Sequence, residues 1–243
     1  MRYLVLSDIH SNIEALQASI KKARDVGYDK ALCCGDLVGY GPNPAEVMDA
    51  LDELGTTSIR GNHDRVISGL DDPVHFNAAA RKAVDWTREH LPASYLQRLA
   101  ELPVGPLEIT ESGRLVHGSA RDEDEYVVTQ HDAVVNLATS APSITFFGHT
   151  HEPGVFTRNV RWTPSYEADG SARLHIPGDK VLVNPGSVGQ PRDGDARASF
   201  LIWDDEQSVL EFYRADYPLE STQARMRSAQ LPDFLITRLA FGR

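Results

Sequence analysis

Side chains that can bind metal ions follow five short apolar segments of the sequence. The stretches VLSDIH, CCGD, IRGNHD, LVHG and FFGHTH supply Asp8, His10, Asp36, Asn62, His63, Asp64, His117, His149 and His151. A single Asp-x-His pair, or one histidine after a strand, is more often a surface or core residue than a ligand. Five such clusters, four of them beside a glycine that permits a tight turn, are hard to reconcile with chance. We therefore expect a metal site.

The residue types limit which ions would bind. Imidazole, carboxylate and amide ligands suit Mn²⁺, Fe, Zn²⁺, Ni²⁺ or Co²⁺. Seven candidate ligands are too many for one ion and suit two ions about 3.5–4 Å apart: Asp8, His10, Asp36, Asn62, His117, His149 and His151. Cys33 and Cys34 are adjacent in the chain, which is poor geometry for a disulfide, so we interpret them as buried free thiols. A cysteine-rich structural zinc site is therefore not expected.

A strand–helix pattern at the start of the chain would position the first three clusters. Residues 2–6, 29–34 and 56–60 have the apolar character of strands, and residues 12–27 and 43–54 have helical spacing. We expect Ser11 to cap the first helix and Gly27 to end it. This alternation indicates a parallel sheet covered by helices. Because sites in such sheets form at the carboxyl ends of the strands, we expect all five clusters to converge on one rim.

The rest of the chain predicts further helices and a second sheet. Residues 76–100 are helical with a break near Leu91-Pro92, and strands at 114–118 and 143–149 enclose a helix at 131–139. Short segments after Gly154 are typical of antiparallel strands in a second sheet packed on the first. The predicted fold class is α/β, with two packed β-sheets, mixed and partly parallel, flanked by helices.

We expect a single domain over residues 1–243, with a helical segment at about 75–100 and a C-terminal helical tail at about 218–243. The tail would cover an edge of the second sheet or mediate a dimer, so a monomer and a homodimer both stay open.

Composition excludes some classes of partner. The chain has 243 residues, 41% of them hydrophobic, and a formal net charge of −11. This acidic balance argues against binding to duplex nucleic acid, which depends on lysine and arginine at the phosphates. No apolar run approaches the roughly 20 residues of a membrane helix, and the first run ends at Asp8, too early for a signal peptide. We therefore expect a cytoplasmic protein without a membrane partner.

The motifs D-x-H, G-D, G-N-H-D, H-G and G-H-x-H, in that order, resemble the calcineurin-like metallophosphoesterase superfamily. The resemblance covers residues 4 to about 200, and the strings GDLVGYGPNP and NPGSVGQPRDGDARASF are similar to its small bacterial phosphodiesterase branch. It implies a metallophosphoesterase-type sandwich and hydrolysis of a small phosphorylated substrate by a hydroxide held between two metal ions, with Mn²⁺ preferred.

The resemblance also implies a role for each motif residue. Asp8, His10, Asp36 and His151 would hold the first metal, and Asp36, Asn62, His117 and His149 the second. His63 would stay free of metal and act on the substrate as a catalytic residue, with Asp64 orienting its ring. Residues 184–187 would form a turn that supports the metal site.

One departure from the family bears on the substrate. Protein phosphatases of this superfamily carry an arginine in G-D-x-V-D-R-G, where this chain has GDLVGYG, with Tyr40 in its place. Without that cation a monoester dianion loses a partner, so we favour diesters, nucleotides or dinucleoside polyphosphates. The alternatives are a phosphomonoesterase or protein phosphatase and, from another class, a non-catalytic scaffold, which the five retained motif histidines oppose.

Three features near the motifs are candidates for substrate contact. Tyr40 would stack on a base or pack in the core, and Arg192 would contact a phosphate. The acidic segment 119–127 follows a ligand histidine and is either a lid or a solvated loop.

Overall fold

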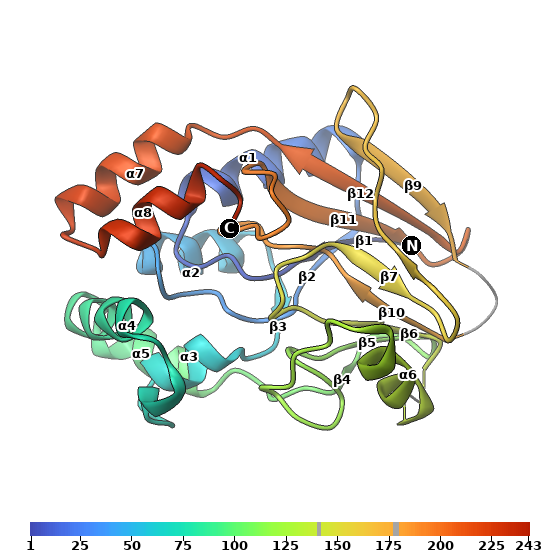
Figure 1. The fold of residues 1–243 in the computed structure, drawn as a ribbon, viewed down its shortest axis with the longest axis horizontal. Coiled ribbons are helices and arrows are strands. Elements are labelled where there is room, and N and C mark those ends of the chain that lie inside the picture. Colours follow the sequence, from blue (N-terminus) through green and yellow to red (C-terminus); the bar gives the residue numbers. More distant parts are fainter. Residues whose placement is uncertain (140–141, 177–179) are drawn as a thin grey trace.

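Two mixed sheets, each of six strands, form the centre of the protein (Figure 1). The computed structural model describes residues 1–139, 142–176 and 180–243. The first sheet has the order β3-β2-β1-β11-β12-β9, in which β1, β2 and β3 are parallel and the other pairs are antiparallel. Its strands are β1 (Arg2–Leu6), β2 (Lys30–Cys33), β3 (Thr57–Ser58), β9 (Ser171–His175), β11 (Ala198–Asp204) and β12 (Val209–Ala215).

The second sheet has the order β4-β5-β6-β10-β7-β8. Strand β6 pairs in parallel with β5 and β10, and the outer pairs are antiparallel. Its strands are β4 (Leu107–Glu108), β5 (Gly113–Leu115), β6 (Ile144–Phe146), β7 (Gly154–Phe156), β8 (Arg161–Trp162) and β10 (Val181–Asn184). The two-residue strands β4 and β8 are too short to give a pattern in the sequence.

The predicted fold class, with two mixed sheets flanked by helices, is confirmed, but the strands divide between the sheets differently. The prediction that the segments after Gly154 form the second sheet is correct for β7, β8 and β10 and wrong for the others. Strands β9, β11 and β12 join the first sheet, whereas β7, β8 and β10 complete the sheet that contains β5 and β6. The composition of these segments indicates antiparallel pairing, which β10 departs from by pairing in parallel with β6, and it does not specify a partner.

Helices cover the outer faces of the sheets and form a lobe beside them (Figure 1). They are α1 (Ile13–Val26), α2 (Pro44–Glu53), α3 (Asn62–Ile67), α4 (Ala78–His90), α5 (Ala93–Ala100), α6 (Gln130–Thr139), α7 (Leu219–Ser228) and α8 (Asp233–Leu239), with a 3-10 turn at Pro73–His75. Gly27 ends α1 as expected, but its cap is Asn12, whose side-chain oxygen accepts from the Ala15 N–H at 3.1 Å. Ser11 lies in a left-handed turn instead, so the expected Ser11 cap is wrong.

The sandwich is held together by apolar side chains from both sheets. Trp203 on β11 stacks on Tyr3 with 4.9 Å between ring centroids and meets Phe146 of the second sheet at 5.2 Å. Another buried cluster lies between the first sheet and helices α1 and α2. Because strands such as β1 are buried on both faces, they read as continuous apolar runs. Cys33 and Cys34 are buried free thiols, as expected.

The C-terminal helices pack on the helical lobe and not on an edge of the second sheet. Leu235 and Leu239 of α8 share a buried cluster with Ala80 and Ala83 of α4 and with Tyr40. The expectation that the tail covers a sheet edge is therefore wrong, because its apolar side faces α4. None of the helices in the described residues has the length and apolar character needed to span a membrane.

Candidate metal centre

The predicted ligands lie where the carboxyl ends of strands from the two sheets meet. The loops after β1 and β2 supply Asp8, His10 and Asp36, and the start of α3 supplies Asn62. The loops after β5 and β6 supply His117, His149 and His151. The clusters converge as expected, but β5 and β6 belong to the second sheet and not to the sheet of β1, β2 and β3. Packing of the two sheets brings the clusters together.

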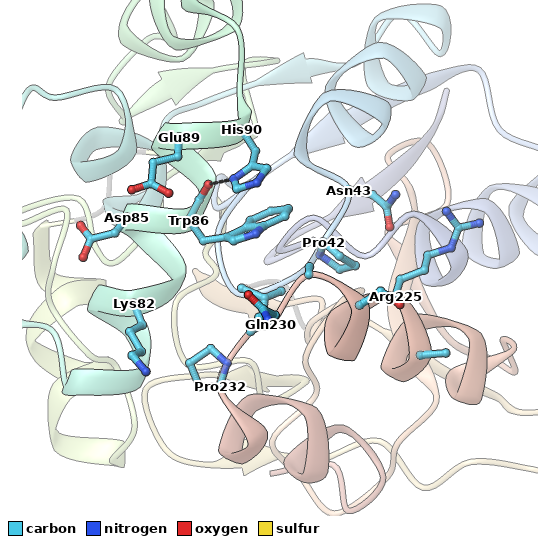
Figure 2. Close-up of a pocket in the computed structure, with 14 residues that line it drawn as sticks. Pro42, Asn43, Lys82, Asp85, Trp86, Glu89, His90, Arg225, Gln230 and Pro232 are labelled. Carbon is cyan, nitrogen blue, oxygen red and sulfur yellow. Dashed lines mark hydrogen bonds between the residues drawn. The ribbon is translucent and has the colours of Figure 1, made fainter.

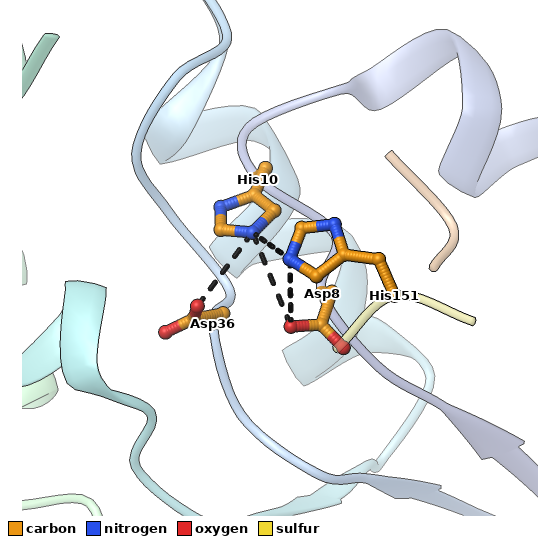
Figure 3. Close-up of side chains that lie close together, drawn as sticks. All are labelled: Asp8, His10, Asp36 and His151. Carbon is orange, nitrogen blue, oxygen red and sulfur yellow. Dashed lines mark hydrogen bonds and ion pairs between the residues drawn. The ribbon is translucent and has the colours of Figure 1, made fainter. Parts of the chain in front are cut away.

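Asp8, His10, Asp36 and His151 form the first cluster, with ligand atoms within 4.8 Å of one another (Figure 3). The Nε2 atom of His10 lies 3.2 Å from that of His151 and 3.6 Å from Oδ2 of Asp36. The His151 Nε2 atom lies 3.3 Å from Oδ1 of Asp8. Burial holds the pKa of both histidines well below the ordinary value, so both rings are neutral. Two neutral imidazole nitrogens aimed at one point are suited to a shared cation.

The second cluster consists of Asp36, His117 and His149, with Asn62 beside them. The Nε2 atom of His117 lies 3.0 Å from Oδ1 of Asn62 and 3.5 Å from Oδ2 of Asp36. The Nε2 atom of His149 is buried and has no hydrogen-bond partner in the described part of the chain, an arrangement that is costly unless a ligand completes it. Burial alone would raise the pKa of Asp36, but the nearby histidines hold it well below its usual range. Asp36 is therefore an anion shared by both clusters.

Backbone carbonyls fix the orientation of three of the ligand histidines. The Nδ1 atoms lie 3.2 Å from Val38 O in His10, 2.8 Å from Cys34 O in His117 and 2.7 Å from Gln190 O in His151. When Nδ1–H donates to such a carbonyl, Nε2 is left with its lone pair directed into the site. The donor set therefore fits divalent transition-metal ions, and these three rings are pre-oriented for them.

Unusual backbone conformations aim the ligands. Asp8, His10, Asp36, His149 and His151 all have φ between 48° and 65°, in the left-handed region that residues with a Cβ atom seldom adopt. Such conformations cost free energy and are concentrated at functional sites. This feature accounts for how side chains at alternate positions, such as Asp8 and His10, reach the same cluster.

The predicted supporting turn lies directly behind the first cluster. The side-chain amide of Asn184 donates to Gly148 O and to Oγ1 of Thr150, both at 2.9 Å, and so holds the loop that carries His149 and His151. The Ser187 hydroxyl donates to Asp8 O at 2.7 Å. Neither side chain is a metal ligand. Both fix the loops that supply ligands.

The His63 ring lies beside the clusters and packs against two aromatic rings. Its ring centroid is 4.3 Å from that of Tyr40 and 4.5 Å from that of Phe76. Burial lowers the pKa of His63 to about 4, so the ring is neutral at pH 7. Nδ1 is buried without a partner, and among the described residues no hydrogen bond involves the ring. Among the described residues His63 belongs to neither ligand cluster, and its freedom from metal ligation stays a prediction.

Asp64 does not orient His63 in this structure. Its carboxylate accepts from the backbone N–H groups of Gly61 at 2.9 Å, Val38 at 3.2 Å and Leu37 at 3.3 Å. Burial and the charge of Asp36 raise the pKa of Asp64 to about 7, against the lowering effect of these bonds. The expected Asp64–His63 pair does not form, because the start of α3 turns the carboxylate inward. Asp64 instead connects α3 to the loop after β2 through these hydrogen bonds.

Tyr40 packs in the core, one of the two alternatives left open by the sequence. It is 8% exposed, and its ring centroid lies 4.6 Å from that of His10. Arg192 lies next to the first cluster, since its backbone N–H donates to His151 O at 3.4 Å. Burial chiefly lowers the pKa of His10 and His151, and the positive charge of Arg192 lowers both further. Its Nη2 donates to Oε1 of Gln190 at 3.2 Å, and its Nε is buried without a partner.

Two aromatic residues beside the site are not evident from the sequence. The ring of Tyr126 lies 3.9 Å from that of His149, and Phe76 packs on His63. Both line a cavity of about 220 Å³ that also contacts Asn62 and His149. The one sequence signal for Tyr126 is its position in segment 119–127, and Phe76 has none. This cavity is the candidate substrate pocket.

The segment 119–127 is anchored by ion pairs. Glu123 bonds to Arg60 at 3.1 Å and to Arg65 at 2.8 Å, and Asp124 bonds to Arg65 at 2.7 Å. These contacts hold the segment against α3, with Tyr126 over His149. It forms one wall of the pocket, a fixed arrangement that differs from a freely solvated loop.

A wider cavity, of about 830 Å³, lies between α4 and the C-terminal helices (Figure 2). Trp86 lines it and stacks on His90 with ring centroids 4.3 Å apart. Neither of the two metal clusters contributes a residue to its wall. It is therefore separate from the candidate metal centre.

Comparison with known proteins agrees with this geometry. Residues 1–208 match the family model of the calcineurin-like phosphoesterase superfamily domain. An uncharacterized protein of Methanocaldococcus jannaschii is 33% identical over 250 residues, which cover 98% of this chain and 97% of that protein. The chain belongs to the calcineurin-like phosphoesterase superfamily.

Solved structures share the whole fold. The crystal structure of a metallophosphoesterase from Sphaerobacter thermophilus has a TM-score of 0.89 and 38% identity, with both chains covered completely. A hypothetical protein from Pyrococcus horikoshii has a TM-score of 0.81 and 22% identity over 100% of this chain and 98% of that one. This second likeness shows the fold alone.

Proposed function

We propose that the protein is a two-metal phosphodiesterase that acts on small phosphorylated substrates, as phosphodiesters or nucleotides. The single observation that carries this proposal is the sharing of Asp36 between two ligand clusters, which is the arrangement that a pair of ions requires. Membership of the phosphoesterase superfamily supports the reaction class.

Asp8, His10, Asp36 and His151 would hold one ion, and Asp36, Asn62, His117 and His149 would hold the other. Mn²⁺ is the ion we favour, and Fe, Zn²⁺, Ni²⁺ or Co²⁺ would suit the same ligands. When bound, a pair of such ions activates water for attack on phosphorus and neutralises charge on the phosphoryl oxygens.

The chain's own side chains would orient the substrate and exclude water. Among the residues that the structure describes, none forms a hydrogen bond with the His63 ring, so the ring is available to a phosphoryl or leaving-group oxygen. Tyr126 and Phe76 line the neighbouring pocket, where they would hold the leaving group away from bulk water. Asp64 would act through the backbone, by holding the loop that carries Asp36.

The preference for a diester follows from Tyr40. Where a protein phosphatase would place an arginine, the Tyr40 ring packs against His10 and His63 and brings no charge to the phosphate. Arg192 favours a second candidate, a phosphomonoesterase, because it is a cation beside the first cluster that could contact a dianion.

One assay decides between these candidates. Metal-stripped protein would be incubated with Mn²⁺, and hydrolysis of bis(p-nitrophenyl) phosphate would be compared with that of p-nitrophenyl phosphate. We expect a higher kcat/KM for the diester. A higher value for the monoester would favour the second candidate, and no hydrolysis of either would indicate a non-catalytic member of the superfamily.

A further inference from the structure

The loop 188–197, between β10 and β11, supports a ligand of the first cluster without supplying one itself. The backbone carbonyl oxygen of Gln190 lies 2.7 Å from Nδ1 of His151, and the N–H of Arg192 donates to His151 O at 3.4 Å. Gln190 is 1% exposed, and its N–H donates to the Ser187 hydroxyl at 2.8 Å. Because the loop contacts both the ring and the backbone of His151, its position sets the orientation of that ring.

The start of the loop is fixed by backbone contacts to the segment that carries Asp8. The N–H of Val188 donates to Ser7 O and that of Gly189 donates to Asp8 O, both at 3.0 Å. Residue 189 must be a glycine, because a Cβ atom at this position would collide with the carbonyl oxygen of Ile9. This end of the loop therefore depends on the main chain and on no ionisable side chain.

The other end of the loop is organised around one buried arginine. Arg214 of β12 is 1% exposed, and its guanidinium pairs with Asp193 and, at 3.7 Å, with Asp195. Its Nη1 donates to Arg197 O at 3.2 Å, and the guanidinium lies over the Tyr166 ring, 4.9 Å from the centroid. Two carboxylates and one carbonyl of the loop thus converge on a single side chain of the first sheet.

Burial makes this arginine the fixed partner in the group. A buried guanidinium has to keep its acceptors, because an unpaired charge in the interior is strongly destabilising. Among the described residues, Asp193 and Asp195 are the carboxylates that pair with Arg214, whose side chain is fully buried. The side chains of the two aspartates are 22% and 28% exposed, so water could solvate them elsewhere. Arg214 therefore dictates where the two aspartates lie, and Asp193 follows Arg192 directly in the chain.

Within the described residues, the loop serves the first cluster and not the second. Its hydrogen bonds to metal ligands go to Asp8 and His151. Both belong to the first cluster alone. In the second cluster, Nδ1 of His117 is held by Cys34 O, which lies on a different loop. A shift of the loop 188–197 should therefore affect binding of the first ion and spare the second.

We infer that Arg214 is a positioning residue for the first metal ion. By fixing Asp193 and Asp195 it holds the loop where Gln190 O accepts from Nδ1–H of His151, and so keeps the Nε2 lone pair of His151 aimed into the cluster. Arg214 itself contacts neither a ligand nor the substrate pocket. The inference rests on the proposed function, since it concerns the same pair of ions, and it makes binding of one of them depend on a side chain outside the site.

Two single-site proteins allow each ion to be measured alone. His149→Ala should leave only the first cluster complete, and His151→Ala only the second. Arg214→Met would be added to each, and Mn²⁺ affinity would be measured by calorimetric titration, which needs no turnover. In His149→Ala we expect binding to weaken about 10-fold, the lower end of the loss that follows removal of a group that orients a metal ligand. In His151→Ala we expect a change of less than about twofold, because the second cluster has its own supports.

A milder variant and a matched control accompany this test. Asp193→Asn changes a partly exposed partner and leaves Arg214 its other carboxylate, so the protein should fold and lose first-site affinity in the same direction by a smaller factor. This variant decides the question if Arg214→Met does not fold. The control is Arg2→Met, which breaks the 2.6 Å ion pair with Glu211 at the start of β1, the end remote from the clusters. It should lower stability in urea unfolding and leave both Mn²⁺ affinities unchanged.

Equal weakening of both single-site proteins, or an unchanged first site in folded Arg214→Met and Asp193→Asn, would overturn the inference and leave Arg214 a purely structural residue. The same selective loss in Arg2→Met would also overturn it, since any broken ion pair in the sheet would then have the effect. Failure of the proposed function is a different result, because it is seen as absent hydrolysis of the aryl diester by the metal-loaded native protein and does not alter these ratios of affinity.

Discussion

The Nε2 atoms of His10 and His151 lie 3.2 Å apart, although the two residues are 141 positions apart in the chain. Both rings are buried and neutral, and each is held through Nδ1 by a backbone carbonyl. Because a neutral ring that donates through Nδ1 has no proton on Nε2, the lone pairs of both Nε2 atoms face each other without a proton between them. A cation at this point would satisfy both nitrogen atoms together with Asp8 and Asp36.

Replacement of His151 by alanine should remove one ion and retain the other. His151 belongs to the first cluster alone, whereas Asp36, His117 and His149 are untouched by the change. We expect calorimetric titration with Mn²⁺ to fall from two equivalents to one. The matched control is His90→Ala, which alters a histidine outside both clusters and should retain two. Two strongly bound equivalents in His151→Ala would contradict the assignment.

Replacement of His63 by alanine should spare metal binding and reduce turnover. The ring ligates no metal in our assignment and is free to contact the substrate, so its loss should lower kcat for the aryl diester by roughly 10²–10⁴-fold. Metal content of the purified variant, measured by elemental analysis, should stay at two per chain. Native turnover in a fully loaded variant would exclude a catalytic role for His63.

Asp64→Asn tests whether Asp64 acts on the backbone or on His63. The three backbone N–H groups bond to both carboxylate oxygens of Asp64. An asparagine side chain has a single acceptor oxygen, and its NH₂ group cannot accept, so we expect a loss of about 1–3 kcal/mol in the free energy of unfolding. Urea unfolding would measure it. If Asp64 instead tuned the His63 ring, the variant would keep its stability and shift only the pH profile of kcat.

The metal-free protein should lose stability as the pH rises from 7 to 10. Burial alone would lower the pKa of His117, but Asp36 overcomes this and raises it from 6.5 to about 10, so the stabilising charge is lost as pH rises through that value. Burial also raises the pKa of Asp8 from 3.8 to about 7, so this group lowers stability as the pH rises from about 4 to 7, where the unfolded chain loses the proton and the folded protein keeps it, and adds no further change above pH 7. Both effects have the same sign.

Metal binding should reverse this trend, because the ligands bind metal only after losing these protons. We expect Mn²⁺ affinity to increase with pH and binding at pH 7 to release protons. Thermal unfolding at pH 6 and pH 9 with and without Mn²⁺, and calorimetry in buffers of different ionisation enthalpy, would measure both effects. A metal-free protein that is more stable at pH 9 than at pH 6 would contradict the pKa directions.

Much of the site could be predicted from the sequence because each ligand follows a recognisable strand. The position of Asp36 after CCG, or of His117 after LV, required only apolar runs and a rule about strand ends. The pairing of the sheets could not be predicted, since β11 and β10 have similar apolar composition and join different sheets.

Contacts between loops also could not be predicted from the sequence. Asp64 stands next to His63 in the chain, but its carboxylate turns toward Leu37 and Val38 because Asn62 begins a helix that is not evident in the pattern. Tyr126 approaches His149 from a segment without a motif. Contacts of this kind depend on tertiary packing, which the residues adjacent in the sequence do not indicate.

The most direct test of the central claim is the amount of Mn²⁺ bound by Asp36→Asn. Asp36 is the residue that the two clusters share, so the native protein should bind two equivalents in a calorimetric titration and the folded variant should lose strong binding at both sites. A native protein that takes up no manganese, or a variant that still binds two ions tightly, would contradict the account.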